Sequence, residues 1–180
     1  MKALIVSDTH GYDKNFYEVI EREGPVDMVI HAGDISGSER DFRRELNCAL
    51  KMVTGNNDWG SSLKSEELFE FDGYTVYLTH GHRDGVYYGT ERLICKAAEL
   101  GADIVIYGHT HVPAIEYDED YHVWAVNPGS LSLPRQNGHQ ASFLVMETDR
   151  LGEVHFSIKY LRKDIDKRAV LWFNDSCFDV

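Results

Sequence analysis

The chain has 180 residues, of which 43% are hydrophobic and 27% charged, a composition typical of one globular domain with a substantial core. A formal net charge of −12, with no stripe of Lys and Arg side chains, argues against a protein that wraps a long nucleic acid. No apolar stretch approaches the ~20 residues that cross a bilayer, and no signal-peptide pattern opens the sequence, so we expect a cytoplasmic protein without a membrane partner.

Strands and helices are predicted to alternate in the first half of the chain. Apolar, β-branched runs predict strands over residues 2–7, 27–31 and 51–54, and amphipathic patterns predict helices over residues 14–23 and 38–48. This order favours βαβ units, in which consecutive strands lie parallel and the crossover is right-handed.

The second half is predicted to form β-hairpins. Asp72-Gly73 is a strong two-residue turn signal between strands over residues 68–71 and 74–79. The remaining expected elements are, in chain order, a helix over residues 89–100, a strand over residues 103–107, and hairpins that turn at residues 118–120 and 149–152. Parallel units followed by hairpins predict an α/β fold in which two packed mixed β-sheets are flanked by helices.

The chain is predicted to form one domain followed by a short tail. We find neither an internal repeat nor an interdomain linker within residues 1–161, which are expected to form the domain. Residues 162–180 begin as a charged segment and make up the tail. Two roles fit this tail, which are docking on the domain and docking on a partner.

Side chains that can bind a metal ion follow strand-like runs in five places. They are Asp8 and His10, Asp34, Asn56, His80 and His82, and His109 and His111. The carboxyl ends of parallel strands meet at one edge of a sheet, so these side chains are expected to lie close together. Taken singly, each has an ordinary alternative, such as a helix cap for Asp8 or Asp34 and a turn for Asn56. It is the ordered set that indicates a metal site.

This ordered set resembles the calcineurin-like metallophosphoesterases, and most closely their small, single-domain YfcE-type phosphodiesterase branch. The matching segments are Asp8-Thr9-His10, Gly33-Asp34, Gly55-Asn56-Asn57-Asp58, Thr79-His80-Gly81-His82, Gly108-His109-Thr110-His111 and Asn127-Pro128-Gly129-Ser130. The resemblance runs over residues 1–160. It implies a four-layer α/β-β/α sandwich of two mixed sheets flanked by helices, with a dinuclear metal centre at the sheet edge.

Carried over by position, the resemblance implies ligands for two divalent metal ions. The first ion would bind Asp8, His10, Asp34 and His111, and the second would bind Asp34, Asn56, His80 and His109. Asp34 would bridge them, because the two oxygens of a carboxylate can hold cations ~3.5–4 Å apart. Imidazole and oxygen ligands without a thiolate suit Mn²⁺, which we expect as the cofactor, with Fe, Zn²⁺ and Ni²⁺ as alternatives.

The third motif departs from the pattern of many larger relatives. Two adjacent cations are expected to turn a bridging water into a hydroxide that attacks phosphorus, and the leaving group then needs a proton. Larger relatives place a histidine after Gly-Asn for this purpose, whereas this chain has Asn57, whose amide can donate a hydrogen bond but not a proton. His82 is the candidate replacement, the alternative being that it only supports His80 or lies at the surface. The departure predicts a preference for diesters with acidic leaving groups, such as aryl esters.

The expected substrate is a small phosphodiester. Arg83 and Arg135 are the candidate side chains that hold its phosphate, with an ordinary surface position as the alternative for both. Two other functions fit the same resemblance, which are hydrolysis of phosphomonoesters at the same centre and a non-catalytic scaffold of the same fold. Every expected ligand is present, which favours an enzyme. The resemblance also implies homo-oligomers that associate through a broad sheet or helix face.

Overall fold

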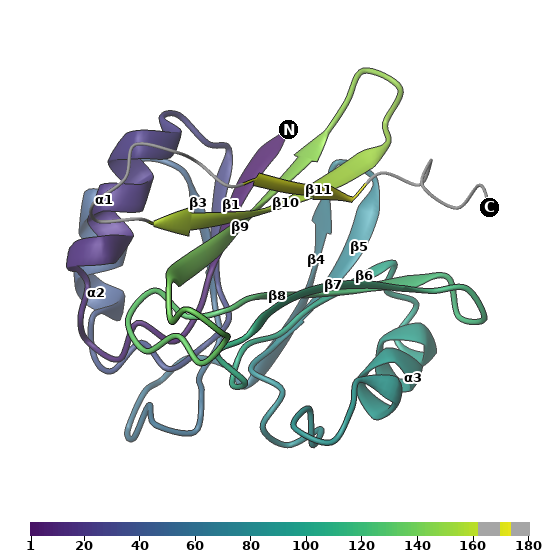
Figure 1. Cartoon of the computed structure of the whole chain (residues 1–180), viewed down its shortest axis with the longest axis horizontal. Coiled ribbons are helices and arrows are strands. Elements are labelled where there is room, and N and C mark those ends of the chain that lie inside the picture. The colour runs from purple at the N-terminus through teal and green to yellow at the C-terminus, as the bar shows by residue number, and fades with distance from the viewer. Residues whose placement is uncertain (162–169, 174–180) are drawn as a thin grey trace.

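Two β-sheets pack face to face between outer layers of helices in the computed structural model, which describes residues 1–161 and 170–173 (Figure 1). Helices α1 (Lys14–Glu23) and α2 (Glu39–Glu45) cover the outer face of one sheet, and α3 (Glu91–Glu99) covers that of the other. These four layers confirm the predicted α/β sandwich. Within the described part of the chain, none of the helices has the length and apolar character needed to cross a bilayer.

The first sheet has six strands in the order β11-β10-β9-β1-β2-β3. In chain order they are β1 (Lys2–Val6), β2 (Met28–His31), β3 (Ala49–Met52), β9 (Ala141–Thr148), β10 (Val154–Leu161) and β11 (Val170–Phe173). Strands β1, β2 and β3 pair in parallel, as the βαβ pattern predicts, while β9 pairs antiparallel with both β1 and β10. The sheet is therefore mixed.

The second sheet has five strands in the order β4-β5-β6-β8-β7. They are β4 (Glu66–Phe71), β5 (Tyr74–Thr79), β6 (Ile104–Ile106), β7 (Pro113–Asp118) and β8 (Val123–Pro128). The β4–β5 hairpin turns at Asp72 and Gly73, which have φ of 48° and 94°, as a two-residue turn of this kind requires. Strands β5, β6 and β8 pair in parallel, so this sheet is mixed as well.

Three apolar clusters hold the four layers together. The largest lies between the sheets and joins residues from both, such as Ile5 and Ile30 with Leu78 and Ile106. A second cluster packs α1 and α2 on the first sheet, and a third packs α3 on the second. Burial on both faces explains why β6, and β1 after Lys2, consist of uninterrupted apolar residues. The same packing brings the carboxyl edges of the two sheets together.

Tertiary pairing moves some predicted boundaries. Helix α2 ends at Glu45 instead of residue 48, because Leu46 is already extended, with ψ of 132°. Strand β3 begins at Ala49 instead of residue 51, because Ala49 pairs with Met28 of β2. In the predicted tail, Val170–Phe173 forms β11 on the edge of β10, so this part docks on the domain. The other tail residues, 162–169 and 174–180, lie outside the described part of the chain.

Candidate metal centre

The candidate ligands leave the carboxyl ends of strands from both sheets. Asp8 and Asp34 follow β1 and β2 of the first sheet, while His80 and His109 follow β5 and β6 of the second. Within each sheet these strands are parallel, so their carboxyl ends share an edge. Asn56 comes four residues after the end of β3, in the loop that returns toward Asp34.

The backbone is unusual at these positions. Nine non-glycine residues of the described chain have positive φ, and five of them are candidate ligands: Asp8 (55°), His10 (48°), Asp34 (56°), His109 (67°) and His111 (59°). Left-handed backbone costs ordinary residues about 1–2 kcal/mol each, and such strain concentrates at functional sites. Hydrogen bonds between the loops hold it in place, from Asp8 N to Gly33 O at 3.0 Å and from His10 N to Asp34 O at 2.9 Å.

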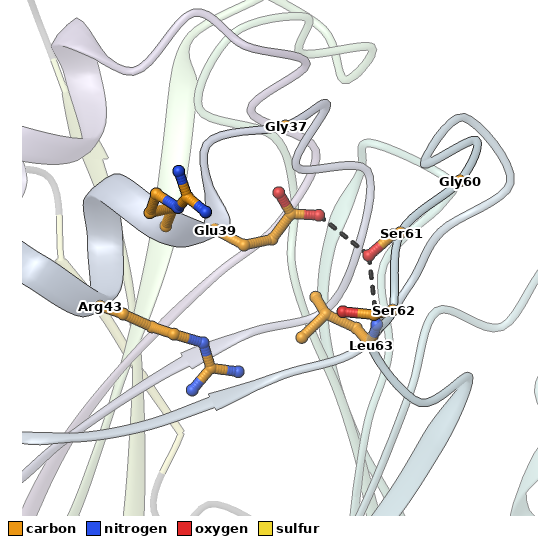
Figure 2. A pocket seen from close by; sticks show the side chains of 8 residues that line it. Gly37, Glu39, Arg43, Gly60, Ser61, Ser62 and Leu63 are labelled. Carbon is orange, nitrogen blue, oxygen red and sulfur yellow. Dashed lines mark hydrogen bonds between the residues drawn. The ribbon is translucent and has the colours of Figure 1, made fainter.

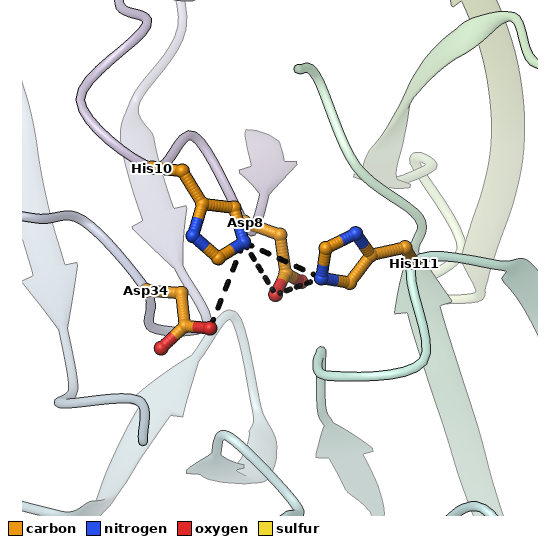
Figure 3. Close-up of side chains that lie close together, drawn as sticks. All are labelled: Asp8, His10, Asp34 and His111. Carbon is orange, nitrogen blue, oxygen red and sulfur yellow. Dashed lines mark hydrogen bonds and ion pairs between the residues drawn. The ribbon is translucent and has the colours of Figure 1, made fainter. Parts of the chain in front are cut away.

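Four of the expected ligands converge on one point (Figure 3). The ligand atoms of Asp8, His10, Asp34 and His111 all lie within 4.8 Å of one another. His10 Nε2 lies 3.8 Å from Asp8 Oδ1 and 3.7 Å from Asp34 Oδ2. His111 Nε2 lies 3.1 Å from Asp8 Oδ1. This is the set that the resemblance implies for the first metal ion.

Backbone carbonyl groups orient two of the imidazole rings. His111 Nδ1 donates to Leu133 O at 2.6 Å, and His80 Nδ1 donates to Ala32 O at 2.7 Å. Because a carbonyl oxygen only accepts, Nδ1 carries the hydrogen in both rings. In the neutral ring, Nε2 then presents a lone pair toward the carboxylates, which is the arrangement of a metal-binding histidine.

The side chains present fit a cation. Asp8 Oδ1 is fully buried and has no hydrogen-bond partner, although three imidazole Nε2 atoms surround it. An orphaned carboxylate oxygen that faces nitrogen lone pairs is costly, unless an imidazole is protonated or a cation sits among these atoms. Carboxylate and imidazole ligands without thiolate suit Mn²⁺, Fe, Zn²⁺ or Ni²⁺.

The residues expected to hold a second ion lie beside the first group. His80 Nε2 is 3.5 Å from Asp34 Oδ2 and 3.2 Å from Asn56 Oδ1. The His109 ring lies edge-on to the His80 ring, with centroids 5.1 Å apart. Asp34 is therefore in contact with both halves of the expected centre, as a bridging carboxylate would be.

The local charges set the protonation of these groups. Burial raises the pKa of Asp8, but His111 and His80 outweigh it and hold the pKa below its usual value. Burial also raises the pKa of Asp34, and its contacts with His80 bring the pKa well below the usual range. Burial lowers the pKa of His80, but the two carboxylates raise it above normal. Burial and the charge of His80 lower the pKa of His109 to about 4. Both carboxylates are thus anionic and His109 is neutral at pH 7.

Asn57 and His82, the two residues considered for proton transfer, both lie next to candidate ligands. Asn57 donates twice to Asp34, from its backbone nitrogen at 2.8 Å and from Nδ2 at 2.7 Å, so its amide holds that carboxylate. The His82 ring lies beside those of His80 and His109, at centroid distances of 5.4 and 6.0 Å. His82 Nδ1 is buried without a hydrogen-bond partner. Burial, together with the charges of His80 and Arg83, lowers the pKa of His82.

The two candidate phosphate-binding arginines differ. Arg135 Nη1 lies 3.4 Å from His109 O and donates to the Tyr87 hydroxyl, which itself donates to His109 O at 3.0 Å. Arg83 is exposed, and no hydrogen bond or ion pair ties it to the described residues of the centre. The structure therefore places Arg135, but not Arg83, against a candidate ligand.

Several groups that shape the centre escaped the sequence analysis. The carbonyl oxygens of Ala32 and Leu133 fix two rings, but a backbone atom leaves no signature in a sequence. Ser130 Oγ donates to Asp8 O at 2.8 Å, and Asn127 Nδ2 donates to Gly108 O at 2.9 Å. The signal for these two was the Asn127-Pro128-Gly129-Ser130 segment, whose turn braces both ligand loops.

Comparison with known proteins is consistent with this geometry. The family model described as "Calcineurin-like phosphoesterase superfamily domain" matches residues 1–151. The probable metallophosphoesterase YsnB of Bacillus subtilis is 33% identical over 151 residues, which are 83% of this chain and 86% of that protein. The phosphodiesterase MJ0936 of Methanocaldococcus jannaschii is 32% identical over 148 residues, covering 72% and 83%. The structure of Vps29 complexed with Zn²⁺ from Entamoeba histolytica shares the fold, with a TM-score of 0.78, 23% identity and coverage of 97% and 100%.

Proposed function

The chain belongs to the calcineurin-like phosphoesterase superfamily, and on this premise we propose that it is a metal-dependent phosphodiesterase that hydrolyses small phosphodiesters. The family and its phosphodiesterase-named relative support a hydrolase. The observation that carries the proposal is the buried Asp8 Oδ1, which has no hydrogen-bond partner and is surrounded by imidazole nitrogens. A cation is the partner that this atom lacks.

We propose two divalent ions, most simply Mn²⁺, held by the seven side chains described above. Asp8, His10, Asp34 and His111 would bind the first, and Asp34, Asn56, His80 and His109 would bind the second. Bound cations at such a site lower the pKa of water and neutralise charge on a phosphate. The chemistry needs no other cofactor.

The chain's own residues position the reaction. Asn57 keeps Asp34 in place with two hydrogen bonds, and the carbonyl groups of Ala32 and Leu133 keep His80 and His111 from rotating. Arg135 lies at the rim next to His109, where its guanidinium can bind a phosphate oxygen. His82 is the candidate proton donor, and the absence of histidine at position 57 favours leaving groups that need little protonation.

A parallel assay tests the proposal against its two alternatives. Bis(p-nitrophenyl) phosphate and p-nitrophenyl phosphate are supplied separately, with Mn²⁺ and with a chelator. Metal-dependent turnover of the diester supports the proposal, and a preference for the monoester supports a phosphatase. No turnover with Mn²⁺, Fe²⁺, Zn²⁺ or Ni²⁺ supports a scaffold. Asp34→Asn is expected to abolish turnover, and Asp149→Asn, in the distant β9–β10 turn, serves as the matched control.

We also propose that this enzyme acts in the cytoplasm and that it can form a homo-oligomer. Fractionation of cells tests the first statement, and light scattering after size exclusion tests the second.

A further inference from the structure

Two adjoining cavities lie beside the candidate centre, between the start of α2 and the loop that follows Asn57. Figure 2 shows the one that is lined by Arg43 and Leu63. One has a volume of about 390 Å³ and the other about 370 Å³. Gly37, Glu39, Gly60 and Ser61 line both, so the two form one continuous hollow. We call this hollow the α2 cavity. Nothing in the proposed chemistry uses it.

The α2 cavity begins at the metal centre. Asn57 lines its inner part, and the same residue donates two hydrogen bonds to Asp34. A diester bound at the centre would therefore lie beside the α2 cavity, and one of its two ester arms can reach into it.

Hydrogen bonds between two loops preform the walls. Asp58 accepts from Ser36 N at 2.6 Å and from Gly55 N at 2.7 Å, so its carboxylate is occupied. Ser61 Oγ donates to Glu39 Oε1 at 3.0 Å across the opening (Figure 2). These contacts fix the loop against the helix without a ligand.

The outer part of the α2 cavity carries unpaired positive charge. Arg40 and Arg43 line it and have no ion pair or hydrogen bond with any residue that the structure describes. Their neighbour Arg44 is paired with Asp41 at 2.8 Å and with Glu45 at 3.0 Å. Spaced three residues apart on α2, Arg40 and Arg43 share one helix face and can hold one anion together. The Glu39 carboxylate lines the same part and offsets one of the two positive charges, so the hollow remains locally positive in a chain with a net charge of −12. A positive hollow favours binding of a phosphate.

An exposed aromatic side chain lines the same hollow. Trp59 lines the inner part of the α2 cavity and is 91% exposed. Exposed indole rings in hollows serve as platforms on which nucleobases stack. The hollow therefore combines Asn57 next to the metal centre, an aromatic ring and a pair of guanidinium groups.

We propose that the α2 cavity binds a nucleotide arm of the substrate, with the base against Trp59 and a second phosphate between Arg40 and Arg43. This proposal rests on the function proposed above and names its substrate class, a phosphodiester with a nucleoside arm that bears a further phosphate. Exposed charge-assisted hydrogen bonds from two guanidinium groups are expected to strengthen binding of that phosphate about tenfold.

Calorimetry on the Mn²⁺-loaded protein tests the proposal with thymidine 3′,5′-bisphosphate, thymidine 5′-monophosphate and thymidine 3′-monophosphate. The bisphosphate is expected to bind about tenfold more tightly than either monophosphate, and the double variant Arg40→Ala/Arg43→Ala is expected to remove this preference. Arg150→Ala is the matched control. Arg150 lies in the β9–β10 turn, near the amino end of β1, whereas Asp8 follows the carboxyl end of that strand. Trp59→Ala is expected to weaken all three nucleotides about tenfold, and Trp59→Phe to preserve binding. Analysis of the ligand after titration verifies that it is intact.

The outcomes separate this proposal from the proposed function. Failure of the wild-type protein to hydrolyse bis(p-nitrophenyl) phosphate overturns the proposed function, whereas the calorimetric comparison decides the α2 cavity by itself. A bisphosphate that binds no better than the monophosphates overturns the proposal. So does a double variant that keeps the full preference, or an Arg150→Ala variant that loses it equally.

Discussion

Gly55→Ala tests how closely the candidate centre is packed. Gly55 lies against Asp34, and a Cβ added to it would come within 2.7 Å of Asp34 Cγ and closer still to Oδ1. The φ of Gly55 lies outside the left-handed region, so alanine meets no backbone penalty there. The collision with Asp34 is the whole effect of the substitution.

The size of the collision gives the expected loss. Two carbon atoms need about 3.5 Å, so Asp34 Cγ has to move by at least about 0.8 Å. The added Cβ also collides with the backbone nitrogen of Asp34, so the loop has to move with the carboxylate. Metal sites tolerate deviations of about 0.2 Å in ligand distance. We therefore expect Mn²⁺ affinity to fall about 100-fold, which is the upper end of the loss seen when the groups that position metal ligands are disturbed. Overpacking is also expected to lower the free energy of unfolding by about 1–3 kcal/mol, which is about 3–9 °C in Tm for a chain of this size.

Calorimetric titration with Mn²⁺ and thermal unfolding followed by circular dichroism measure the two effects. Gly24→Ala is the control, because Gly24 has φ of 70° and nothing lies within 4 Å of an added Cβ. With ψ of −155°, Gly24 adopts a backbone conformation that only glycine populates readily, so alanine costs about 1–3 kcal/mol there but keeps the centre intact. A Gly55→Ala protein that binds Mn²⁺ as tightly as Gly24→Ala would refute the packing argument.

Three further predictions concern pH, metal and substrate. His31 is fully buried against Phe42, and burial lowers its pKa from 6.5 to about 4. The unfolded state therefore binds the proton more readily than the folded state. The contribution of His31 to the free energy of unfolding is fully present above pH 6.5 and falls by about 3 kcal/mol as the pH drops from 6.5 to 4. Urea denaturation at several pH values is expected to show a shallower loss in His31→Leu, and equal slopes would contradict this. Mn²⁺ at 100 times its Kd is expected to raise the free energy of unfolding by about 2.7 kcal/mol, and a chelator is expected to reverse the accompanying rise in Tm. In Asp8→Asn, Mn²⁺ is expected to leave the Tm unchanged. A series of aryl phosphodiesters is expected to show a steep dependence of kcat/KM on leaving-group pKa, and a flat series would mean that an efficient proton donor is present.

Local sequence patterns account for much of the fold. The apolar strand β1 and the Asp72-Gly73 hairpin are determined by neighbours in the chain, and both lie where the pattern predicts. The boundary between α2 and β3 depends on the pairing of Ala49 with Met28, 21 residues earlier in the chain, which no local pattern contains. Strand β11 is an edge strand in a charged tail, so its placement on β10 could not be predicted either.

The candidate centre divides in the same way. Strand ends predicted that Asp8, Asp34 and His111 would meet. Parallel pairing gives Asp8 and Asp34 a common edge, and the packing of the two sheets brings His111 to that edge. The choice between Arg83 and Arg135 depends on loop paths, and only the structure shows Arg135 against His109. The α2 cavity arises where a short helix faces a loop, so it has no periodic signature in the sequence.

The candidate ligands are divided between the two sheets, with Asp8 and Asp34 on one and His80 and His111 on the other. An ion bound among them would link the two sheets at the edge where their ligand loops meet. The two sheets cannot separate at that edge without pulling the ligand atoms apart. Opening of the edge is therefore coupled to release of the ion. Amide hydrogen exchange in strands β1 and β6, whose carboxyl ends lead into the ligand loops, should therefore slow when the ion is bound.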